Sequence, residues 1–313
     1  MTNKRRIPIG IVQDKFAFPD GEGFLQLACS IGAQRVELKY ESFLDTKYDL
    51  RGKTAWIIKK QAQECAIGLS VHAPYEEGVS FGDPDPKVRE NTRKQMSRCI
   101  EFADAIGAEY ITVHGGAFEI KPEPLVKATL GQPQRVFLRD LVQENDLNAL
   151  KERTYEDLDW FFHEVNRRGM VPALENFHDF SNFKVRYPII PEDFKEIGEV
   201  LGDSFSINYD TGHGHSTGIH ILKFIKAIGV SNIMGTHLHD NHQLGDEHLP
   251  IYQGTVDFDA FFRAYKENHW DFPLNIEVKN IEDLLQSWRS LNRVFYGVGE
   301  EVPSIQLPIR ELP

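Results

Sequence analysis

Short apolar segments recur eight times along the chain, and a segment with helical spacing follows each of them. The apolar segments are rich in Ile, Val and Leu and are mostly continuous rather than alternating. This pattern is typical of parallel strands that are buried on both faces. The predicted strands are Ile7–Val12, Arg35–Leu38, Gly68–Val71, Tyr110–Val113, Val171–Leu174, Phe205–Tyr209, Asn232–Gly235 and Pro273–Ile276.

Between the strands, apolar residues three and four positions apart predict helices. The strongest start signal precedes the third helix and reads Asp83-Pro84-Asp85-Pro86. The predicted helices are Gly23–Ile31, Lys53–Ala66, Lys87–Ile106, Leu147–Arg168, Pro191–Leu201, Ile221–Ile228, Phe258–Asn268 and Ile281–Phe295. Several are followed by a glycine that suits a left-handed helix end, namely Gly32, Gly68, Gly107, Gly169, Gly202 and Gly229.

Strands that alternate with helices in this way predict an α/β protein with a single (β/α)8 TIM barrel. We expect one domain over residues 1–313, with a core at about 7–295 and an extended C-terminal tail at 297–313. A doubly wound open sheet is the alternative, but it rarely reaches this many regular units. Two connections, Gly115–Asp146 and Asn176–Ile190, are longer than a barrel needs. Both follow strands, on the side where barrel active sites lie, so they are candidate lids or subunit contacts.

Composition narrows the class of partner and the compartment. The formal net charge of −12 disfavours nucleic acid and favours a small-molecule substrate, although a local basic groove is compatible with it. No apolar run approaches the roughly 18 residues of a membrane span, and the run after the basic N-terminus is too short for a signal peptide. Cys29, Cys65 and Cys99 are odd in number, so we expect buried free thiols and a cytoplasmic protein.

Polar residues of metal-ligand type stand at the ends of most predicted strands. Strands five to eight end in Glu175, Asp210, His237 and Glu277, and strands three and four end in His72 and His114. Any one of them could be a hydrogen-bonded structural group, but strand ends converge at the mouth of a barrel. The set from strands five to eight can therefore meet around one ion. Three carboxylates and one imidazole suit Mn²⁺, Mg²⁺, Co²⁺ or Zn²⁺.

A second group of acids and histidines would surround those four. It comprises His72, His114, His213, Asp246 and His248. These side chains could hold further metal ions, support the first ligands, or contact substrate without any metal. The residue types alone leave these alternatives open.

The residues also match a family pattern. The matching stretches are Val71-His72-Ala73-Pro74-Tyr75, Asn208-Tyr209-Asp210-Thr211-Gly212-His213, Thr236-His237-Leu238-His239-Asp240-Asn241, Gly245-Asp246-Glu247-His248-Leu249-Pro250 and Gly254-Thr255-Val256-Asp257-Phe258. Over about Ile7 to Val294 the chain resembles the xylose isomerase-like barrel superfamily, specifically its sugar phosphate isomerase/epimerase group. The resemblance implies that Glu175, Asp210, His237 and Glu277 are the shared metal ligands. It also implies Glu175 and Glu277 as the acid/base pair, with Mn²⁺ favoured as the ion.

Endonuclease IV shares this fold, and its nine zinc ligands are also matched. The matching positions are His72, His114, Glu175, Asp210, His213, His237, Asp246, His248 and Glu277. Two departures count against a nuclease, in addition to the negative charge. Glycine follows His114 where the nuclease pattern has proline, and Phe177 and His178 stand where a small, glycine-rich turn is expected.

Sugar isomerisation or epimerisation begins with proton removal from a carbon beside a carbonyl. A metal ion chelated by the carbonyl and a neighbouring hydroxyl would stabilise the enediolate, and two carboxylates on opposite faces could remove and return the proton. Return to the opposite face of the same carbon is epimerisation, and return to the neighbouring carbon is aldose–ketose isomerisation. We expect His213 to move hydroxyl protons, as a third catalytic residue. The expected substrate contacts are Tyr75, Asn176, His239 and Asn241.

The sequence thus predicts a metal-dependent isomerase or epimerase of a small sugar. A lyase, a dehydratase or a C-glycoside-cleaving enzyme would use the same residues, and a trinuclear zinc phosphodiesterase like endonuclease IV is a further alternative. A catalytically silent binding barrel is disfavoured by the intact ligand set. Relatives of this kind suggest a homodimer or homotetramer.

Overall fold

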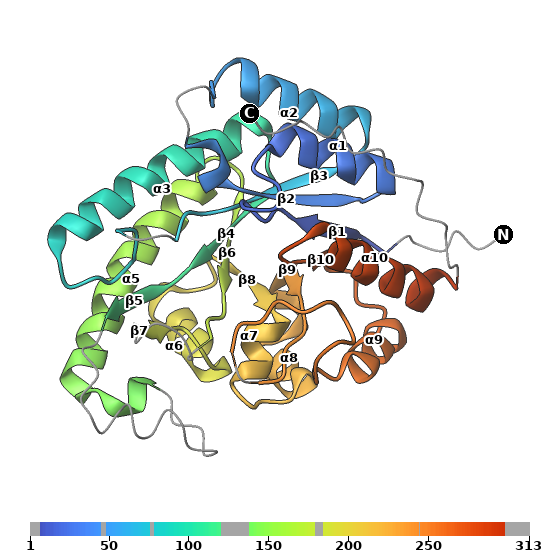
Figure 1. Ribbon diagram of the computed structural model, residues 1–313. Coiled ribbons are helices and arrows are strands. Elements are labelled where there is room, and N and C mark those ends of the chain that lie inside the picture. The colour runs from blue at the N-terminus through green and yellow to red at the C-terminus, as the bar shows by residue number, and fades with distance from the viewer. Residues whose placement is uncertain are drawn as a thin grey trace.

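A computed structural model describes residues 7–44, 48–75, 78–119, 138–178, 184–243 and 245–297. Parallel strands close into a barrel, in the order β1-β10-β9-β8-β6-β4-β3-β2 (Figure 1). Its strands are β1 (Ile9–Val12), β2 (Arg35–Lys39), β3 (Gly68–His72), β4 (Tyr110–His114), β6 (Val171–Glu175), β8 (Ser206–Asp210), β9 (Ile233–Leu238) and β10 (Leu274–Ile276). The predicted (β/α)8 barrel is therefore confirmed.

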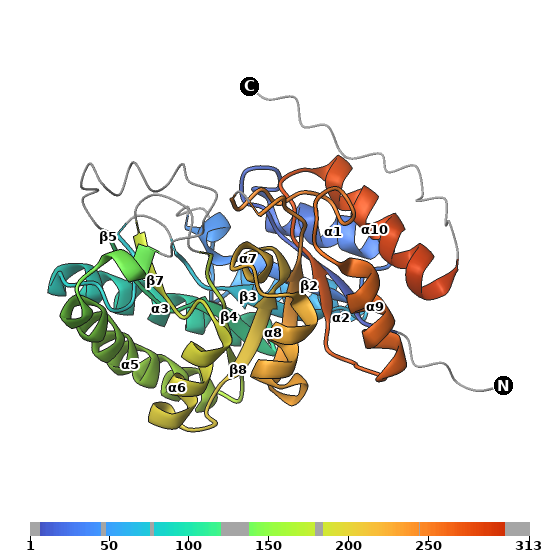
Figure 2. The same ribbon diagram turned by 90° about the horizontal axis from the view of Figure 1, so that it is seen from below.

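Helices surround the barrel on the outside (Figure 2). They are α1 (Gly21–Ile31), α2 (Lys53–Glu64), α3 (Pro86–Ile106), α5 (Glu144–Asn166), α6 (Pro191–Leu201), α7 (Thr211–Ser216), α8 (Ile221–Ile228), α9 (Phe258–Glu267) and α10 (Ile281–Tyr296). Short 3-10 turns are η1 (Tyr40–Phe43), η2 (Leu138–Leu141) and η3 (Val230–Asn232). The start of α3 follows from its sequence, because the Asp85 side chain accepts from the Lys87 N–H and Pro86 occupies the first turn. Among these helices, the short α7 is the one that the periodicity does not predict.

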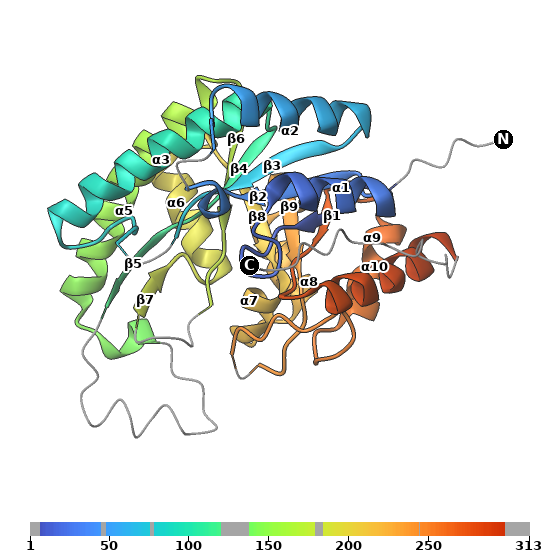
Figure 3. The same cartoon turned by 45° about the horizontal axis from the view of Figure 1, so that its top comes forward.

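The two long connections contain a small sheet that the sequence did not predict. Strands β5 (Gly116–Glu119) and β7 (Lys184–Tyr187) pair antiparallel, outside the barrel. They lie beside α5 (Figure 3). Both strands are short and sit in otherwise polar segments, which explains why no pattern marked them. Residues 120–137 and 179–183 of these connections lie outside the described part of the chain, so the lid and subunit-contact roles stay predictions.

The expected left-handed glycine turns are confirmed only in part. Gly32 and Gly107 end α1 and α3 in the left-handed conformation, with φ of 74° and 76°. Gly68 instead begins β3, and Ala66, with φ of 53°, takes the left-handed position after α2. A Cβ atom at Gly68 would lie 2.1 Å from a guanidinium nitrogen of Arg35, so a larger residue there would displace the end of that side chain. Gly169 also has a positive φ. Gly202 and Gly229 follow α6 and α8 with positive φ, but their ψ angles of −169° and 126° lie outside the left-handed helical conformation, so the prediction is wrong for these two.

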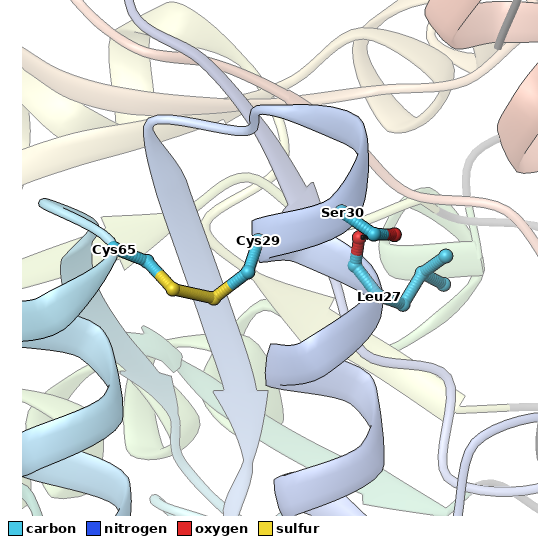
Figure 4. The surroundings of a disulfide bond; sticks show 4 residues. All are labelled: Leu27, Cys29, Ser30 and Cys65. Carbon is cyan, nitrogen blue, oxygen red and sulfur yellow. Dashed lines mark hydrogen bonds between the residues drawn. A yellow bond between two sulfur atoms is a disulfide. The ribbon is translucent and has the colours of Figure 1, made fainter. Parts of the chain in front are cut away.

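A disulfide joins Cys29, in the last turn of α1, to Cys65 at the end of α2 (Figure 4). The expectation of free thiols is therefore wrong for these two residues. The reason is tertiary: α1 and α2 are neighbours in the ring, and their ends bring the two Cα atoms to 5.7 Å. A separation of 36 residues carries no such signal in the sequence. Cys99 is free and buried, as expected.

We expect this disulfide to stabilise the fold without affecting the strand ends at the other side of the barrel. Closing a loop of this length contributes roughly 3–4 kcal/mol. In a chain of this size that corresponds to a fall in melting temperature of about 5–10 °C when the bond is lost. Calorimetry of Cys65→Ser should show this fall, and a reductant should lower the melting temperature of the wild-type protein but not of the variant. An unchanged wild-type value in reductant would contradict the prediction.

The two chain ends lie outside the described part of the structure. They are residues 1–6 and the predicted extended tail beyond Gly297. Within the ranges that the structure describes, no helix is long and apolar enough to cross a membrane.

Candidate metal centre

Of the four strand-end residues predicted from the sequence, the three carboxylates converge on Nδ1 of the fourth, His237. Its distance is 2.8 Å to Glu175 Oε1, 3.1 Å to Glu277 Oε2 and 3.9 Å to Asp210 Oδ2. All four side chains are buried. They come from the ends of β6, β8, β9 and β10, which meet at one mouth of the barrel. The structure therefore brings together a compact group of three carboxylates and one imidazole.

Glu37 of β2 fixes the direction in which the His237 ring faces. Its Oε1 lies 2.8 Å from His237 Nε2, and its Oε2 accepts hydrogen bonds from the hydroxyls of Ser70 and Thr112. With Nε2 directed to Glu37, Nδ1 is left to face the three ligand carboxylates. A carboxylate behind a ligating histidine is a recurrent support of metal sites. Sequence reasoning missed Glu37, although the alternation Val36-Glu37-Leu38-Lys39 within a buried strand could have marked it.

Sequence reasoning also missed Lys39, which lies at the end of β2. Its Nζ lies 2.7 Å from Glu277 Oε1, and both side chains are buried. The two oxygens of Glu277 are thus divided between Lys39 and His237. Burial by itself disfavours both charges, but the attraction between them dominates. It holds the pKa of Lys39 well above its ordinary value, while Lys39 and His237 hold the pKa of Glu277 well below.

Glu175 connects the first ligand group to a second one. Its Oε2 lies 3.1 Å from His114 Nε2 and 3.3 Å from His72 Nε2, while its Oε1 faces His237. His72 donates from Nδ1 to the Ala73 carbonyl, which leaves its Nε2 directed at Glu175. Burial lowers the pKa of His114 to about 4, against the attraction of Glu175. A neutral imidazole of this kind is suited to metal ligation.

A third group forms around Asp246. Its carboxylate lies 3.0 Å from His248 Nε2 and 3.6 Å from His213 Nε2. His213 donates from Nδ1 to the Asn176 carbonyl, which leaves Nε2 directed at Asp246. Burial disfavours the charge on His213, but Asp210 and Asp246 raise its pKa to about 10. His178, which sequence reasoning did not select, has its Nε2 3.8 Å from Asp246.

The donor atoms of these groups fit a divalent metal ion. Sets such as His72–His114–Glu175 and His239–Asp246–His248 place one ligand atom from each residue within 4.8 Å of the others. Within the described ranges, His114 Nε2, Glu175 Oε2 and Asp246 Oδ1 are buried atoms that make no hydrogen bond. Buried polar atoms are normally satisfied, so these atoms point to a missing partner. Nitrogen and carboxylate donors suit Mn²⁺, Co²⁺ or Zn²⁺ better than a softer ion.

The residues expected to contact substrate separate into two kinds. Tyr75 lines the pocket at this mouth and is 39% exposed. Asn176 instead exchanges two hydrogen bonds with the backbone of Asp210, and Asn241 bonds the Gly212 carbonyl and the Gln243 N–H. Both ends of each amide are engaged, so we do not carry these two residues into the proposed substrate site.

His239 likewise contacts the candidate metal ligands rather than the pocket. It is fully buried, and its Nε2 lies 3.0 Å from Asp210 Oδ1. Its ring stacks on that of His248, with centroids 4.0 Å apart. Gly212 makes this position possible, because a Cβ atom there would lie 1.9 Å from the His239 ring. We therefore assign His239 to holding Asp210 and His248 rather than to contacting substrate.

A pocket of about 1070 Å³ opens above the metal centre. Glu175 and Glu277 both line it, as do members of the second and third groups. Asp210 and His237 lie beneath them and are not among the lining residues. The pocket therefore exposes the two glutamates to a ligand, while the other two core ligands stay covered.

Replacing Glu37 by glutamine should weaken metal binding by about 10–100-fold, because supporting carboxylates of this kind have effects of that size. The His237 ring would lose the anion that fixes its orientation and raises its basicity. Titration calorimetry with Mn²⁺ would measure the change. Ser70→Ala is the matched control, since it removes a bond to the other oxygen of Glu37 and leaves His237 untouched. Equal affinities for Glu37→Gln and the wild type would contradict the assignment.

Comparisons with known proteins agree with the barrel. A family model described as a xylose isomerase-like TIM barrel matches residues 25–294. The uncharacterised protein MJ1311 of Methanocaldococcus jannaschii is 28% identical over 240 residues, which cover 75% of this chain and 73% of that protein. The uncharacterised protein y4fM of Sinorhizobium fredii is 32% identical over 191 residues, or 57% of this chain and 59% of that protein.

Solved structures with the same fold include several sugar epimerases. A D-tagatose 3-epimerase-like protein has a TM-score of 0.67 at 24% identity, and the match covers 86% of this chain and 91% of that one. An L-ribulose 3-epimerase has a TM-score of 0.70 at 16% identity, covering 94% of both chains. The 3-keto-D-glucoside 4-epimerase YcjR of E. coli has a TM-score of 0.68 at 17% identity, covering 92% of this chain and 99% of that one. At these identities the likeness establishes a shared fold.

Proposed function

Because the chain belongs to the xylose isomerase-like TIM barrel family, we propose that it is a metal-dependent isomerase or epimerase of a small sugar or sugar-like substrate. The observation that carries this proposal is the placement of Glu175 and Glu277. Both reach Nδ1 of His237, and both line the pocket above it. The sugar epimerases among the structural neighbours support the same class of reaction.

In this proposal the chain's own residues hold the substrate and move its proton. A divalent ion, Mn²⁺ in the first instance, would be held by Glu175, Asp210, His237 and Glu277 and would supply Lewis-acid stabilisation of the enediolate oxygens. One of the two glutamates removes the proton beside the carbonyl, and the other returns it. Lys39 holds one oxygen of Glu277 and leaves the other directed at the centre.

The fate of the proton distinguishes the members of this reaction class. Return to the opposite face of the same carbon gives an epimer, and return to the neighbouring carbon gives the aldose or ketose isomer. Loss of a leaving group from the enediolate would instead give a dehydratase or a C-glycoside-cleaving lyase. His213, beside Asp246, is proposed to move hydroxyl protons in each case. We also propose a homodimer or homotetramer. The cytoplasmic location expected from free thiols is not carried into this proposal, because Cys29 and Cys65 form a disulfide.

A trinuclear zinc phosphodiesterase is the second candidate, and one observation favours it. Glu175 divides its oxygens between His237 and the His72–His114 pair, as a carboxylate that bridges two metal ions would. Asp246 groups with His213 and His248 at a third position. The net charge of −12 opposes binding to the phosphate backbone of DNA. Sugar chemistry is therefore the first candidate.

Metal stoichiometry separates the two candidates. We expect elemental analysis of protein purified with Mn²⁺ and Zn²⁺ present to give one tightly bound ion per chain, held by the four core ligands. Asp246→Asn should leave that stoichiometry unchanged, because Asp246 lies outside the core group. Three zinc ions per chain, together with cleavage of abasic DNA, would exclude the single-metal account.

A further inference from the structure

The pocket above the metal centre has two halves of different chemistry. The half over the barrel axis is lined by ionisable side chains, among them Lys39, Glu175 and Glu277. The other half extends sideways toward α3 and the β5–β7 sheet. Apolar side chains line it, namely Val79, Phe81, Val88, Met96, Phe118 and Phe177. They come from the loop after β3, from α3, from β5 and from the segment after β6.

The polar groups that border the apolar half are engaged with the protein. The Ser80 hydroxyl donates to the carbonyls of Phe81 and Ala117, and Asp83 accepts from the Asp85 N–H. Lys184 pairs with Glu119 across the small sheet, at 3.6 Å. These contacts give the charged groups at this edge of the pocket partners within the protein, while Val79, Val88 and Phe118 supply apolar surface.

The guanidinium of Arg186 is engaged in the same way. It lies 5.6 Å from the centroid of the Phe177 ring, and it donates to the His178 carbonyl. The Arg186 guanidinium therefore packs against the segment after β6. The polar rim of the apolar half therefore belongs to the protein's own hydrogen-bond network.

The size of the pocket exceeds what a single sugar ring requires. Pockets of roughly 300–1,000 Å³ hold drug-sized ligands, and this one measures about 1070 Å³. A free monosaccharide is much smaller and carries a hydroxyl on nearly every carbon. A hydroxyl buried without a partner costs about 1–3 kcal/mol, so a polyol would be a poor occupant of the apolar half. The two halves together suit a ligand that is polar at one end and apolar at the other.

We propose that the substrate is a sugar that carries an apolar alkyl or aryl substituent. The sugar ring is held at the metal centre, and the substituent lies in the half lined by Val79, Val88 and Phe118. This inference rests on the proposed sugar chemistry and extends it by naming the substrate class. It assigns to the β5–β7 sheet, which lies outside the barrel, the role of forming one wall of a substituent site.

The 6-O-methyl, 6-O-butyl and 6-O-hexyl ethers of D-fructose are suitable probes for this site, because each keeps the ketone that the proposed reaction requires. Titration calorimetry with the Mn²⁺-loaded full chain should show tighter binding as the alkyl chain grows. Each methylene that becomes fully buried should tighten binding about fourfold, which corresponds to roughly 0.8 kcal/mol. A dissociation constant that is the same for all three ethers would overturn the proposal.

Two variants test whether the dependence of affinity on chain length arises in the apolar half. Phe118→Ser should reduce the dependence on chain length, and Val79→Asp, in a loop where a fold defect is less of a concern, should abolish it. Phe16→Ser is the matched control, because Phe16 is 83% exposed and does not line the pocket. The wild-type dependence retained in both pocket variants would overturn the assignment to this half.

Deuterium exchange into free ketoses, measured in parallel, separates this inference from the proposed function. Exchange without any dependence of affinity on chain length would overturn the substituent site and leave the sugar chemistry standing. A dependence that Val79→Asp abolishes, with no exchange into any sugar, would support the site and count against the proposed reaction.

Discussion

Replacing Glu277 with glutamine should abolish exchange of solvent deuterium into the substrate while the protein stays folded. Glutamine keeps the shape of the side chain and an oxygen that can accept from Lys39, but it cannot take up or return a proton. General acid–base groups contribute about 10²–10⁴-fold to the rate, and we expect a loss within this range. The measurement is the rate of deuterium incorporation, by mass spectrometry, at saturating Mn²⁺.

Glu277 is also a proposed metal ligand, so the loss must be separated from loss of the ion. Titration of Mn²⁺ into Glu277→Gln gives its occupancy under the assay conditions, and the rate is compared at equal occupancy. Glu282→Gln, in the first turn of α10 and away from the pocket, is the matched control. Exchange retained at the wild-type rate with metal bound would remove Glu277 from the acid/base role.

Replacing Lys39 with methionine should have the second large effect, on stability in the absence of metal. The change removes the cation 2.7 Å from Glu277 and leaves a carboxylate buried near Glu175, Asp210 and Glu37. Breaking a buried ion pair from one side costs about 3–5 kcal/mol. Denaturant unfolding after chelation of metal would measure the loss, and added Mn²⁺ should recover more stability in the variant than in the wild type. Lys39→Arg, which keeps the charge, is the control.

The pH dependence of that loss has a definite sign. In the wild type the folded-state pKa of Glu277 is well below its ordinary value, because of Lys39 and His237. Its contribution to stability is therefore complete above the ordinary carboxyl range and declines as the pH falls toward the folded value. Without Lys39 the pKa of Glu277 should rise. Protonation of Glu277 at low pH would then remove the buried charge that destabilises the variant. The stability difference should be larger at pH 8 than at pH 5, and a difference that grows toward pH 5 would contradict the account.

The barrel could be predicted because its strands are buried on both faces and are therefore continuously apolar. That same rule explains the features that were missed. Strands β5 and β7 lie outside the barrel and are too short to show a pattern. The disulfide depends on the packing of α1 against α2, which the spacing of Cys29 and Cys65 does not reveal.

The site could be predicted in part because parallel strand ends meet at one mouth. From the sequence alone, this rule places Glu175, Asp210, His237 and Glu277 together. Glu37 lies inside the predicted strand Arg35–Leu38 rather than at its end, and lysine is not a residue of metal-ligand type, so neither Glu37 nor Lys39 meets the strand-end rule. A sequence also does not show which groups the oxygen and nitrogen of an amide side chain will bond. For that reason Asn176 was expected at the substrate, although its amide bonds the backbone of Asp210.

The most direct test of the account is solvent-deuterium exchange with a panel of ketoses and the Mn²⁺-loaded wild-type protein in deuterated water. We expect one deuterium on a carbon beside the carbonyl of at least one sugar, together with formation of its epimer or isomer. Chelation of the metal should stop both. No deuterium in any sugar, with cleavage of abasic DNA by the zinc-loaded protein, would contradict the account.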